Sequence, residues 1–331
     1  MKKRRCLSII IIALFSAVTA YSQQNAALLK QAEELHRNYN FTKAIEIYRS
    51  ILAQRPDSTL TTEADSLYNT EVKSRLITSE NGSNMLQFAS SPEIVAKQVF
   101  PAENFFLNYP GVNKGEWMLP PALSAPAEEQ KGNPFNVMHL SKGGKSIVFS
   151  APDESGSWNI MHSGKLNDTL WPSPQILNEN VTTAGNEILP HLSPDGKILY
   201  FSSDGHYGMG GYDLYMSRWD EELGDWDVAQ NMGFPFSSTG NDYLFYNTPC
   251  GNFSVMASDR ETTRNQVTIY AAKYEALPLK SEISEAQAPA AAKMNISNRS
   301  AQAQPASQPD GQKSATQQDA EFASYSAAVK E

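Results

Sequence analysis

Cysteine is scarce in this sequence. Only two of its 331 residues are cysteines, Cys6 and Cys250. Cys6 lies within the first 22 residues, which are expected to be removed on export, so Cys250 alone cannot supply a disulfide framework or a cysteine-ligated metal cluster. A small apolar residue at the edge of a turn explains Cys250 better than a nucleophile does.

The sequence also lacks the short motifs that mark many active sites. It contains no G-x-S-x-G elbow, no phosphate-binding loop and no H-E-x-x-H pair. Residues 153–158 are similar to the Asp-box turn of sialidases, but the aspartate and the glycine are one residue too far apart. His139 and His191 occupy equivalent places in two copies of a repeat, which indicates packing residues. We therefore expect no enzyme activity, no cofactor and no metal site.

A long apolar run is missing outside the first twenty or so residues. Four basic residues precede the apolar run 7–18, and small residues follow near Ser22. This layout is typical of a secretion signal over residues 1–22. The run is too short to span a bilayer comfortably, and Cys6 precedes it and so cannot be a lipidation site at the cleavage point. We expect an exported protein with no integral membrane span after cleavage.

Positive charge is in deficit. The chain has 27 basic and 36 acidic residues, a formal charge of −9, and loss of the signal removes four of the basic ones. Such an acidic chain argues against binding to nucleic acid and to anionic membrane surfaces. The last fifty residues are poor in aromatic side chains and rich in Ala, Gln, Ser and Pro, so residues 281–331 are predicted to be disordered.

A repeat of about 54 residues is present. A Gly-Asn pair occurs three times at a nearly constant interval, and a tryptophan also occurs three times at nearly the same interval. An Asp-Gly turn recurs in a weaker form. A period near 50 with several short strands in each unit is typical of β-propeller blades. We expect about four blades over residues 85–280, closed or incomplete, with a divergent first blade over 93–135. The residues assigned to the structural repeat are Asn133, Asn186, Asn241, Trp117, Trp171, Trp226, Asp195 and Gly196.

Residues 193–203, followed by residues 210–215, resemble the WD40-like (PD40, TolB-type) β-propeller repeat. Together with Trp226 and residues 231–238, they are similar to envelope proteins of certain Gram-negative bacteria, which often couple a tetratricopeptide segment to such blades. The resemblance implies a place in the periplasm or at the periphery of the outer membrane, with envelope proteins as partners. No peptidoglycan-binding domain of the OmpA type fits the C-terminal segment.

Residues 23–80 are predicted to be helical. Two amphipathic helices fit residues 25–56, and their small and aromatic positions are similar to one tetratricopeptide repeat. A single repeat cannot bury both of its faces, so we expect it to pack on another part of the chain, either the helical stretch Glu63 to Thr78 or the flank of the propeller. The sequence predicts that Glu80 to Ser83 end this stretch and that strands start from Met85.

Two classes of function remain open. The first is a non-catalytic envelope protein that offers propeller and helical surfaces to protein partners. The second is a glycan-binding or glycan-processing module, which would gain support if Trp158, Tyr207, Tyr212 and Trp219 lined one concave face with two carboxylates. The residues considered for ligand binding are Asp204, His206, Tyr207, Tyr212 and Trp219. Trp117, Trp171 and Trp226 are expected to be buried anchors of the blades, and Trp219 is expected to lie in a polar loop.

Overall fold

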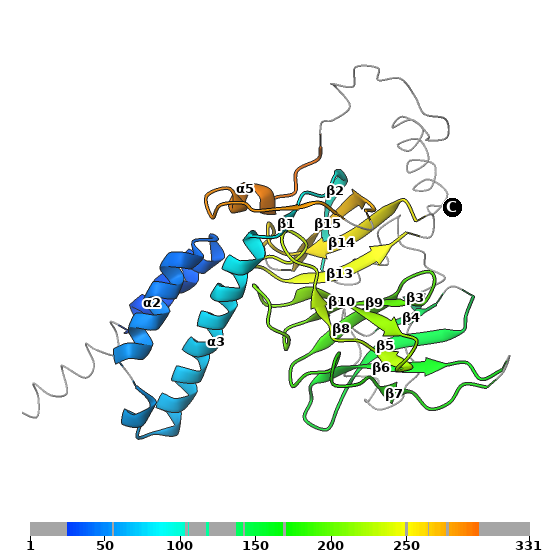
Figure 1. Ribbon diagram of the computed structural model, residues 1–331, viewed down its shortest axis with the longest axis horizontal. Helices are drawn as coiled ribbons and strands as arrows, with labels where there is room; N and C mark the ends of the chain where they lie inside the picture. The colour runs from blue at the N-terminus through cyan, green and yellow to red at the C-terminus, as the bar shows by residue number, and fades with distance from the viewer. Residues whose placement is uncertain are drawn as a thin grey trace, which may run out of the picture. The chain divides into compact units, whose positions relative to one another are not determined.

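The computed structural model describes residues 25–54, 56–102, 105, 117–118, 137–141, 143–167, 170–248, 251–263, 265–275 and 278–297. It confirms a mainly β protein with a few helices in its N-terminal part (Figure 1). The chain forms two compact units, a helical unit up to Gln87 with Ser284–Pro289, and a β unit from Phe88 to Ile283 with the chain from Ala290 onward. The predicted signal segment and Asn133 lie outside the described residues.

In the part of the helical unit that the structure describes, three helices and one short 3-10 turn lie between Asn25 and Leu86. Residues 25–37 are helical, and they are followed by α2 (Phe41–Gln54), η1 (Asp57–Thr59) and α3 (Glu63–Leu86). Figure 1 shows α2 and α3 side by side. The core between the helices is built from the predicted apolar stripes, and its buried members are Ala32, Ala44, Tyr48, Ile51 and Val72. The hydroxyl of Thr62 caps α3 by accepting a hydrogen bond from Asp65 N at 3.1 Å.

The predicted end of the third helix near Ser79 is wrong, because α3 continues to Leu86. Gly82 sits directly against the ring of Phe41, and a Cβ added there would lie 2.6 Å from two ring carbons. Glycine in a helix costs about 1 kcal/mol relative to alanine, but here it permits close packing of two helices. The expected strand from Met85 is therefore helix, and the first strand is β1 (Ala89–Ser90).

Among the described residues, the β unit contains three large antiparallel sheets and a two-stranded one formed by β1 and β16 (Lys280–Ser281). Sheet I has the order β3 (Trp117–Met118), β4 (Met138–Leu140), β5 (Ser146–Pro152), β6 (Trp158–Gly164) and β7 (Gln175–Ile176). Sheet II has the order β8 (Glu187–Leu192), β9 (Ile198–Ser203) and β10 (Asp213–Asp220), and both β11 (Asp225–Trp226) and β12 (Gln230–Asn231) pair with β10. Sheet III has the order β13 (Asp242–Asn247), β14 (Phe253–Ser258), β15 (Gln266–Lys273) and β2 (Ile94–Pro101).

Strand β2 corrects the predicted divergent first blade. It pairs antiparallel with β15, with Pro101 opposite Gln266 and Ile94 opposite Ala272. Sheet III is thus completed by a strand that precedes sheet I in the chain. Because strands paired at this sequence separation leave no periodic signal, the repeat could not reveal the pairing. Where the sequence predicts about four blades, the described residues form three sheets of this kind.

Two apolar clusters lie between neighbouring sheets. Sheets I and II enclose a cluster whose buried members include Val148, Ile160, Leu199, Phe201, Tyr215 and Trp226. Sheets II and III enclose another that includes Tyr200, Leu214, Phe245, Met256 and Tyr270. The opposite face of sheet III packs on Phe105 and Trp117. Both faces of sheets II and III therefore contribute buried side chains, as strands stacked face to face require.

The predicted domain boundary at residue 281 lies too early. Strand β16 (Lys280–Ser281) pairs with β1, and α5 (Ala288–Ala292) follows. In the β unit, Lys97 Nζ donates to Lys293 O at 2.7 Å, Ser297 N donates to Ile94 O at 2.9 Å, and Met294 is buried. Backbone pairing and one apolar anchor thus hold a segment that composition alone marks as disordered. Residues 298–331 of that segment lie outside the described residues.

Candidate functional site

The five residues considered for ligand binding do not converge on one site. Asp204, His206 and Tyr207 follow β9, Tyr212 immediately precedes β10, and Trp219 lies near the other end of β10. A strand rises about 3.3 Å per residue, so seven residues along β10 separate Tyr212 from Trp219 by roughly 23 Å. These two aromatic residues cannot line one concave face.

Trp219 also corrects the prediction of a polar loop. It belongs to β10, pairs opposite Trp226 of β11, and is partly buried. The two indole rings meet edge to face with their centroids 5.4 Å apart. Trp219 therefore contributes to the packing between sheets I and II.

The loop after β9 is mainly structural. His206 is partly buried, its Nε2 is 2.9 Å from Val181 O, and its ring lies against Tyr215. Tyr212 is partly buried beside Tyr243, and burial raises the pKa of Tyr212, with a further contribution from the Asp204 carboxylate. Tyr207 is the clear exception, since 76% of it is exposed.

The Gly-Asn repeat has a definite physical role. The backbone N and the Nδ2 of Asn186 donate to the two carboxylate oxygens of Asp204 at 2.7 and 2.9 Å. The Oδ1 of Asn186 accepts from Trp158 N of sheet I at 3.0 Å. Gly185 lies so close to Gly205 that an added Cβ would be 2.4 Å from the Gly205 Cα. Asp204 is therefore occupied in joining two strands of one sheet, and Asn186 also joins neighbouring sheets.

The same arrangement recurs one repeat later. Asn241 N and Nδ2 donate to Asp259 at 2.8 and 2.7 Å, and Asn241 Oδ1 accepts from Tyr212 N of sheet II at 3.0 Å. We call each set an Asn–Asp clasp, formed by Asn186 with Asp204 and by Asn241 with Asp259. The clasp explains why Asn and Asp recur together in this sequence without any ligand.

Buried carboxylates close the loops that lead into the first strands of sheets II and III. Glu187 accepts from the hydroxyl of Thr183 at 2.6 Å and from its backbone N at 3.2 Å. Asp242 accepts from Ser238 N at 2.7 Å and from its hydroxyl at 3.0 Å. Because these carboxylates are occupied by internal donors and lie in the interior, they are poorly placed to act as a pair on a sugar.

The turn at Asp195 and Gly196 forms between β8 and β9, where the sequence places it. Asp195 Oδ1 accepts from the Ser193 hydroxyl at 2.5 Å and from Lys197 N at 3.1 Å. The hydrogen bond from Ser193 is the main reason that the pKa of Asp195 lies below its ordinary value. Its carboxylate is therefore a turn acceptor.

The three repeat tryptophans do not occupy one equivalent position. Trp226 and Trp117 are both buried, each 4% exposed, as expected of anchors. However, Trp226 of β11 pairs opposite Trp219 of β10, whereas Trp117 of β3 pairs opposite His139 of β4. Trp171 precedes β7 and is only partly buried. Their spacing therefore reflects two different packing roles.

Equivalent strands of the three sheets bring aromatic rings together. His139 of β4, His191 of β8 and Tyr246 of β13 are buried, with ring centroids 4.3 Å apart for the two histidines and 4.8 Å apart for His191 and Tyr246. Trp117 lies 5.0 Å from His139. Burial holds the pKa of His191 well below its ordinary value, and His139 adds to this effect. The two histidines serve as packing residues, as their place in the repeat indicates.

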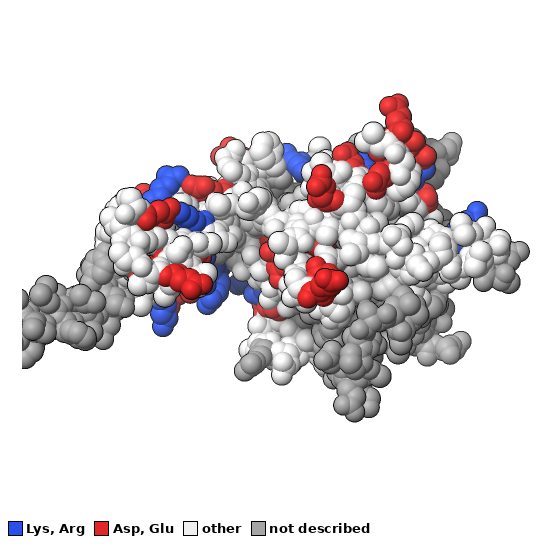
Figure 2. Space-filling view, turned by 90° about the horizontal axis from the view of Figure 1, so that it is seen from below, with Lys and Arg blue, Asp and Glu red and all other residues white. Residues whose placement is uncertain are grey.

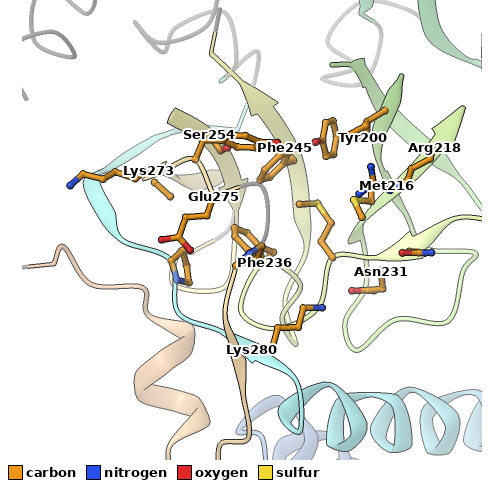
Figure 3. Close-up of a pocket in the computed structure, with 17 residues that line it drawn as sticks. Tyr200, Met216, Arg218, Asn231, Phe236, Phe245, Ser254, Lys273, Glu275 and Lys280 are labelled. Carbon is orange, nitrogen blue, oxygen red and sulfur yellow. The ribbon is translucent and has the colours of Figure 1, made fainter. Parts of the chain in front are cut away.

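An apolar pocket of about 280 Å³ opens between sheets II and III (Figure 3). Its apolar lining includes Tyr200, Met216, Met232, Phe236 and Phe245. The ring of Phe245 contacts Tyr200 with centroids 4.9 Å apart and Phe236 with centroids 5.8 Å apart. Burial raises the pKa of Tyr200 to about 12, so its hydroxyl is uncharged at neutral pH. The five residues considered for ligand binding are all described, and none of them lines this pocket.

Charged side chains surround the pocket. Arg218, Lys273, Glu275 and Lys280 are among the residues that line it. Lys273 is bound to Glu93 at 2.7 Å, and Figure 3 shows its side chain extending away from the other lining residues. Arg218 and Lys280 are exposed. In Figure 2, acidic side chains form several separate groups on the visible face.

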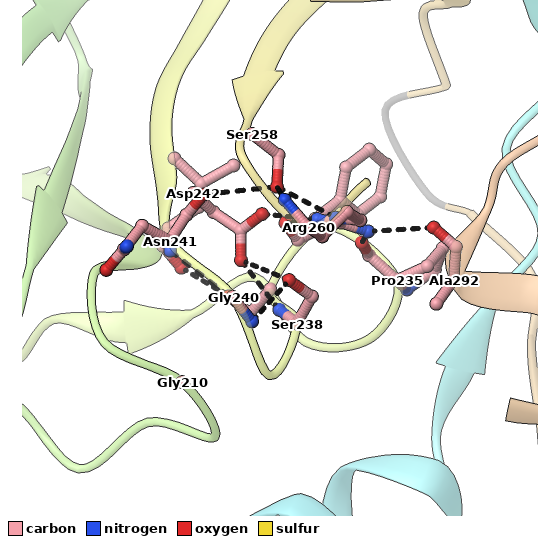
Figure 4. A network of polar contacts seen from close by, with 12 residues as sticks. Gly210, Pro235, Ser238, Gly240, Asn241, Asp242, Ser258, Arg260 and Ala292 are labelled. Atoms are coloured by element: carbon pink, nitrogen blue, oxygen red, sulfur yellow. Dashed lines mark hydrogen bonds and ion pairs between the residues drawn. The ribbon is translucent and has the colours of Figure 1, made fainter. Parts of the chain in front are cut away.

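Arg260 fixes one wall of the pocket (Figure 4). Its guanidinium is almost fully buried and forms an ion pair with Asp242. It donates to the backbone oxygens of Pro235 at 2.5 Å, of Phe236 at 2.9 Å and of Ala292 at 3.3 Å. The loop that carries Phe236 into the pocket is thus tied to the first strand of sheet III.

Sequence reasoning missed this pocket because its lining comes from strands of two different sheets. A signal was present nonetheless. Residues two apart on a strand lie on the same face of the sheet. Ile198 and Tyr200 are two apart on β9, and Met216 and Arg218 are two apart on β10. A strand face with large apolar residues that ends in a cation is the pattern expected at the edge of an apolar pocket.

Comparison with protein-family models and with curated proteins found no match to this sequence. Within the described parts of the chain, no helix combines the length and apolar character needed to cross a bilayer. The same residues contain no cluster of three or more His, Cys, Asp or Glu side chains arranged to hold a metal ion. The pocket between sheets II and III is therefore the candidate functional site, argued from its geometry alone.

Proposed function

We propose that this protein is an exported, non-catalytic interaction protein of a Gram-negative envelope. In this proposal the three sheets are blades of a WD40-like (PD40, TolB-type) propeller, and the helical unit is a tetratricopeptide-like segment. Both units offer surfaces to envelope proteins at the periplasm or the periphery of the outer membrane. The resemblance of residues 193–215 to the propeller repeat and the secretion-signal layout of residues 1–22 support this placement.

The observation that carries the binding role is the pocket between sheets II and III. A concave, mainly apolar site with a few polar groups at its edge is the usual form of a binding site. Methionine adapts to differently shaped partners because it is unbranched and polarizable, and two methionines, Met216 and Met232, line this pocket. We infer that a partner inserts an apolar side chain here.

The glycan-binding alternative would have gained support from Trp158, Tyr207, Tyr212 and Trp219 on one concave face. Strand β10 separates Tyr212 from Trp219 by most of its length, so these two residues do not lend that support. The carboxylate of Asp204 is occupied by the Asn–Asp clasp. No described feature favours this second function over the first.

The test compares two variants of sheet II. Met232→Glu places a charge in the pocket, whereas Val228→Glu changes an exposed apolar residue (60% exposed) that does not line the pocket. Affinity capture from envelope extracts should recover the same partner with the parent and with Val228→Glu and lose it with Met232→Glu, while all three proteins have closely similar melting temperatures. Equal recovery by both folded variants would contradict the proposal.

Export is tested separately by intact-mass measurement of the protein purified from the envelope. Loss of residues 1–22, or of 1–20 at the alternative small site, is expected. A retained Met1 in that fraction would contradict the predicted signal segment.

A further inference from the structure

We propose that the pocket between sheets II and III binds the C-terminus of a partner protein, with a large apolar last side chain inside and the terminal carboxylate at Arg218. This inference rests on the proposed function, since it names the chemistry of the partner for the same site. Three properties of the pocket support it: its volume, its charge and the relation between its apolar and cationic parts.

The volume admits about one large side chain. At about 280 Å³ the pocket lies just below the usual range for small-molecule sites, roughly 300–1,000 Å³. Its walls are aromatic rings and thioethers, which pack well against aromatic and long aliphatic groups. The residue that enters is therefore large and apolar, such as phenylalanine, leucine or methionine.

The charge at the edge selects an anion. Of the lining cations, Lys273 is already paired with Glu93, whereas Arg218 and Lys280 have exposed side chains. Arg218 lies near enough to Tyr200 to act on that hydroxyl electrostatically, which places its guanidinium beside the pocket. Arginine presents a planar fork of donors that matches a carboxylate. Glu275 adds one negative charge to the same lining and disfavours a second acid next to the first.

The combination of one apolar pocket and one adjacent cation favours a chain terminus over an internal acidic residue. In an extended peptide, neighbouring side chains point to opposite sides. An internal apolar residue and the acid beside it therefore cannot both face the pocket. A C-terminal residue carries its apolar side chain and its carboxylate on the same Cα, so a single residue satisfies both parts of the site. Capture of terminal carboxylates is an established mode of peptide recognition.

The experiment uses the mature full-length protein and fluorescein-labelled peptides in a polarization assay. The probes are Ser-Gly-Ser-Gly-Phe with a free C-terminal carboxylate, its C-terminal amide, the same peptide ending in Ser, and an internal Phe-Asp version closed by an amide. The free-acid Phe peptide should bind about tenfold or more tightly than each of the others, a factor that corresponds to one charge-assisted hydrogen-bonded contact. Arg218→Gln should lower the affinity for the free-acid Phe peptide to that for the amide peptide. The affinity for the amide peptide itself should not change. The matched control is Lys197→Gln, an exposed cation of the same sheet that does not line the pocket, and it should change neither affinity.

The outcomes separate this inference from the proposed function. Equal binding of acid and amide, tighter binding of the internal acid, or tighter competition by decanoate than by unlabelled acid peptide would each overturn the terminus as occupant. If no peptide binds while Met232→Glu still abolishes partner capture, the inference fails and the proposed function stands. If the acid peptide binds in an Arg218-dependent way while Met232→Glu leaves partner capture intact, the captured protein docks elsewhere, which contradicts both the pocket as the carrier of the proposed function and the C-terminus of that partner as its occupant.

Discussion

Replacing Arg260 by alanine tests the central claim about how sheet III and the pocket are held together. The guanidinium is 3% exposed and the carboxylate of Asp242 is fully buried. Removing the cation leaves a buried carboxylate that keeps only uncharged donors such as Ser238 N and the hydroxyls of Ser238 and Ser258. It also removes the donors to the oxygens of Pro235, Phe236 and Ala292.

The expected loss is large. Breaking a buried ion pair by removing one partner typically destabilises a protein by about 3–5 kcal/mol. For a domain of roughly 150–250 residues, each kcal/mol shifts the melting temperature by about 2–4 °C. A loss near 4 kcal/mol therefore lowers the melting temperature of the β unit by roughly 8–16 °C. That loss is a substantial share of the ~5–15 kcal/mol that stabilises a typical domain.

The assay is thermal and urea unfolding followed by tryptophan fluorescence. All five tryptophans belong to the β unit, so the signal reports this unit and not the helical one. Lys197→Ala is the matched control, because Lys197 forms an ion pair with Glu221 at 2.9 Å but both side chains are largely exposed. The control should unfold close to the parent.

Two further measurements can refute the reasoning. Burial raises the pKa of Asp242, while Arg260 lowers it. In Arg260→Ala the pKa of Asp242 rises further, so the folded variant takes up a proton as the pH falls, and its deficit against the parent shrinks at acidic pH. Arg260→Ala combined with Asp242→Asn should be more stable than Arg260→Ala at neutral pH, because the unpaired charge is gone. If the unfolding free energy of Arg260→Ala lies within about 1 kcal/mol of the parent value, the ion pair between Arg260 and Asp242 does not stabilise this region. The same conclusion follows if the double variant is no more stable than Arg260→Ala.

Three more outcomes are expected. Trp226→Ala should cost about 3–5 kcal/mol, as large-to-small core substitutions do, and Trp219→Ala should cost less but still be measurable, since Trp219 packs on Trp226 while partly exposed; unfolding like the parent in either variant would contradict the packing. The lowered pKa of His191 means that the folded protein keeps the ring neutral while the unfolded chain binds a proton below about pH 6.5. Stability is therefore fully present above that pH and falls as the pH drops below it, and urea unfolding from pH 7.5 to 5 should show a weaker dependence in His191→Phe; an unchanged slope would argue against it. Gly82→Ala should destabilise the helical unit by about 1–3 kcal/mol, because the new Cβ meets the Phe41 ring, and a stabilised helix in circular-dichroism melting would show that the ring moves aside.

The sequence alone determined the features that depend on near neighbours. The turn at Asp195 and Gly196 forms from the chemistry of five consecutive residues, 193–197. The mainly β character and the apolar stripes of the N-terminal helices follow from hydrophobic periodicity, which is a property of consecutive residues. Asn186 and Asn241 were visible as repeats, because the Asn–Asp clasp uses the same local spacing of eighteen residues in both copies.

Only the tertiary structure decided the features that depend on contacts distant in sequence. Helix α3 continues past Glu80 because Gly82 meets Phe41, a contact that outweighs local helix propensity. Strand β2 joins β15 about 170 residues later in the chain, and no periodic pattern records such a pairing. The pocket exists because β9 and β10 face β13 to β15 across the boundary between two sheets, with Arg260 fixing the loop between them. Side chains that meet across sheets are placed by packing and by the satisfaction of buried polar groups, and neither can be read from one strand at a time.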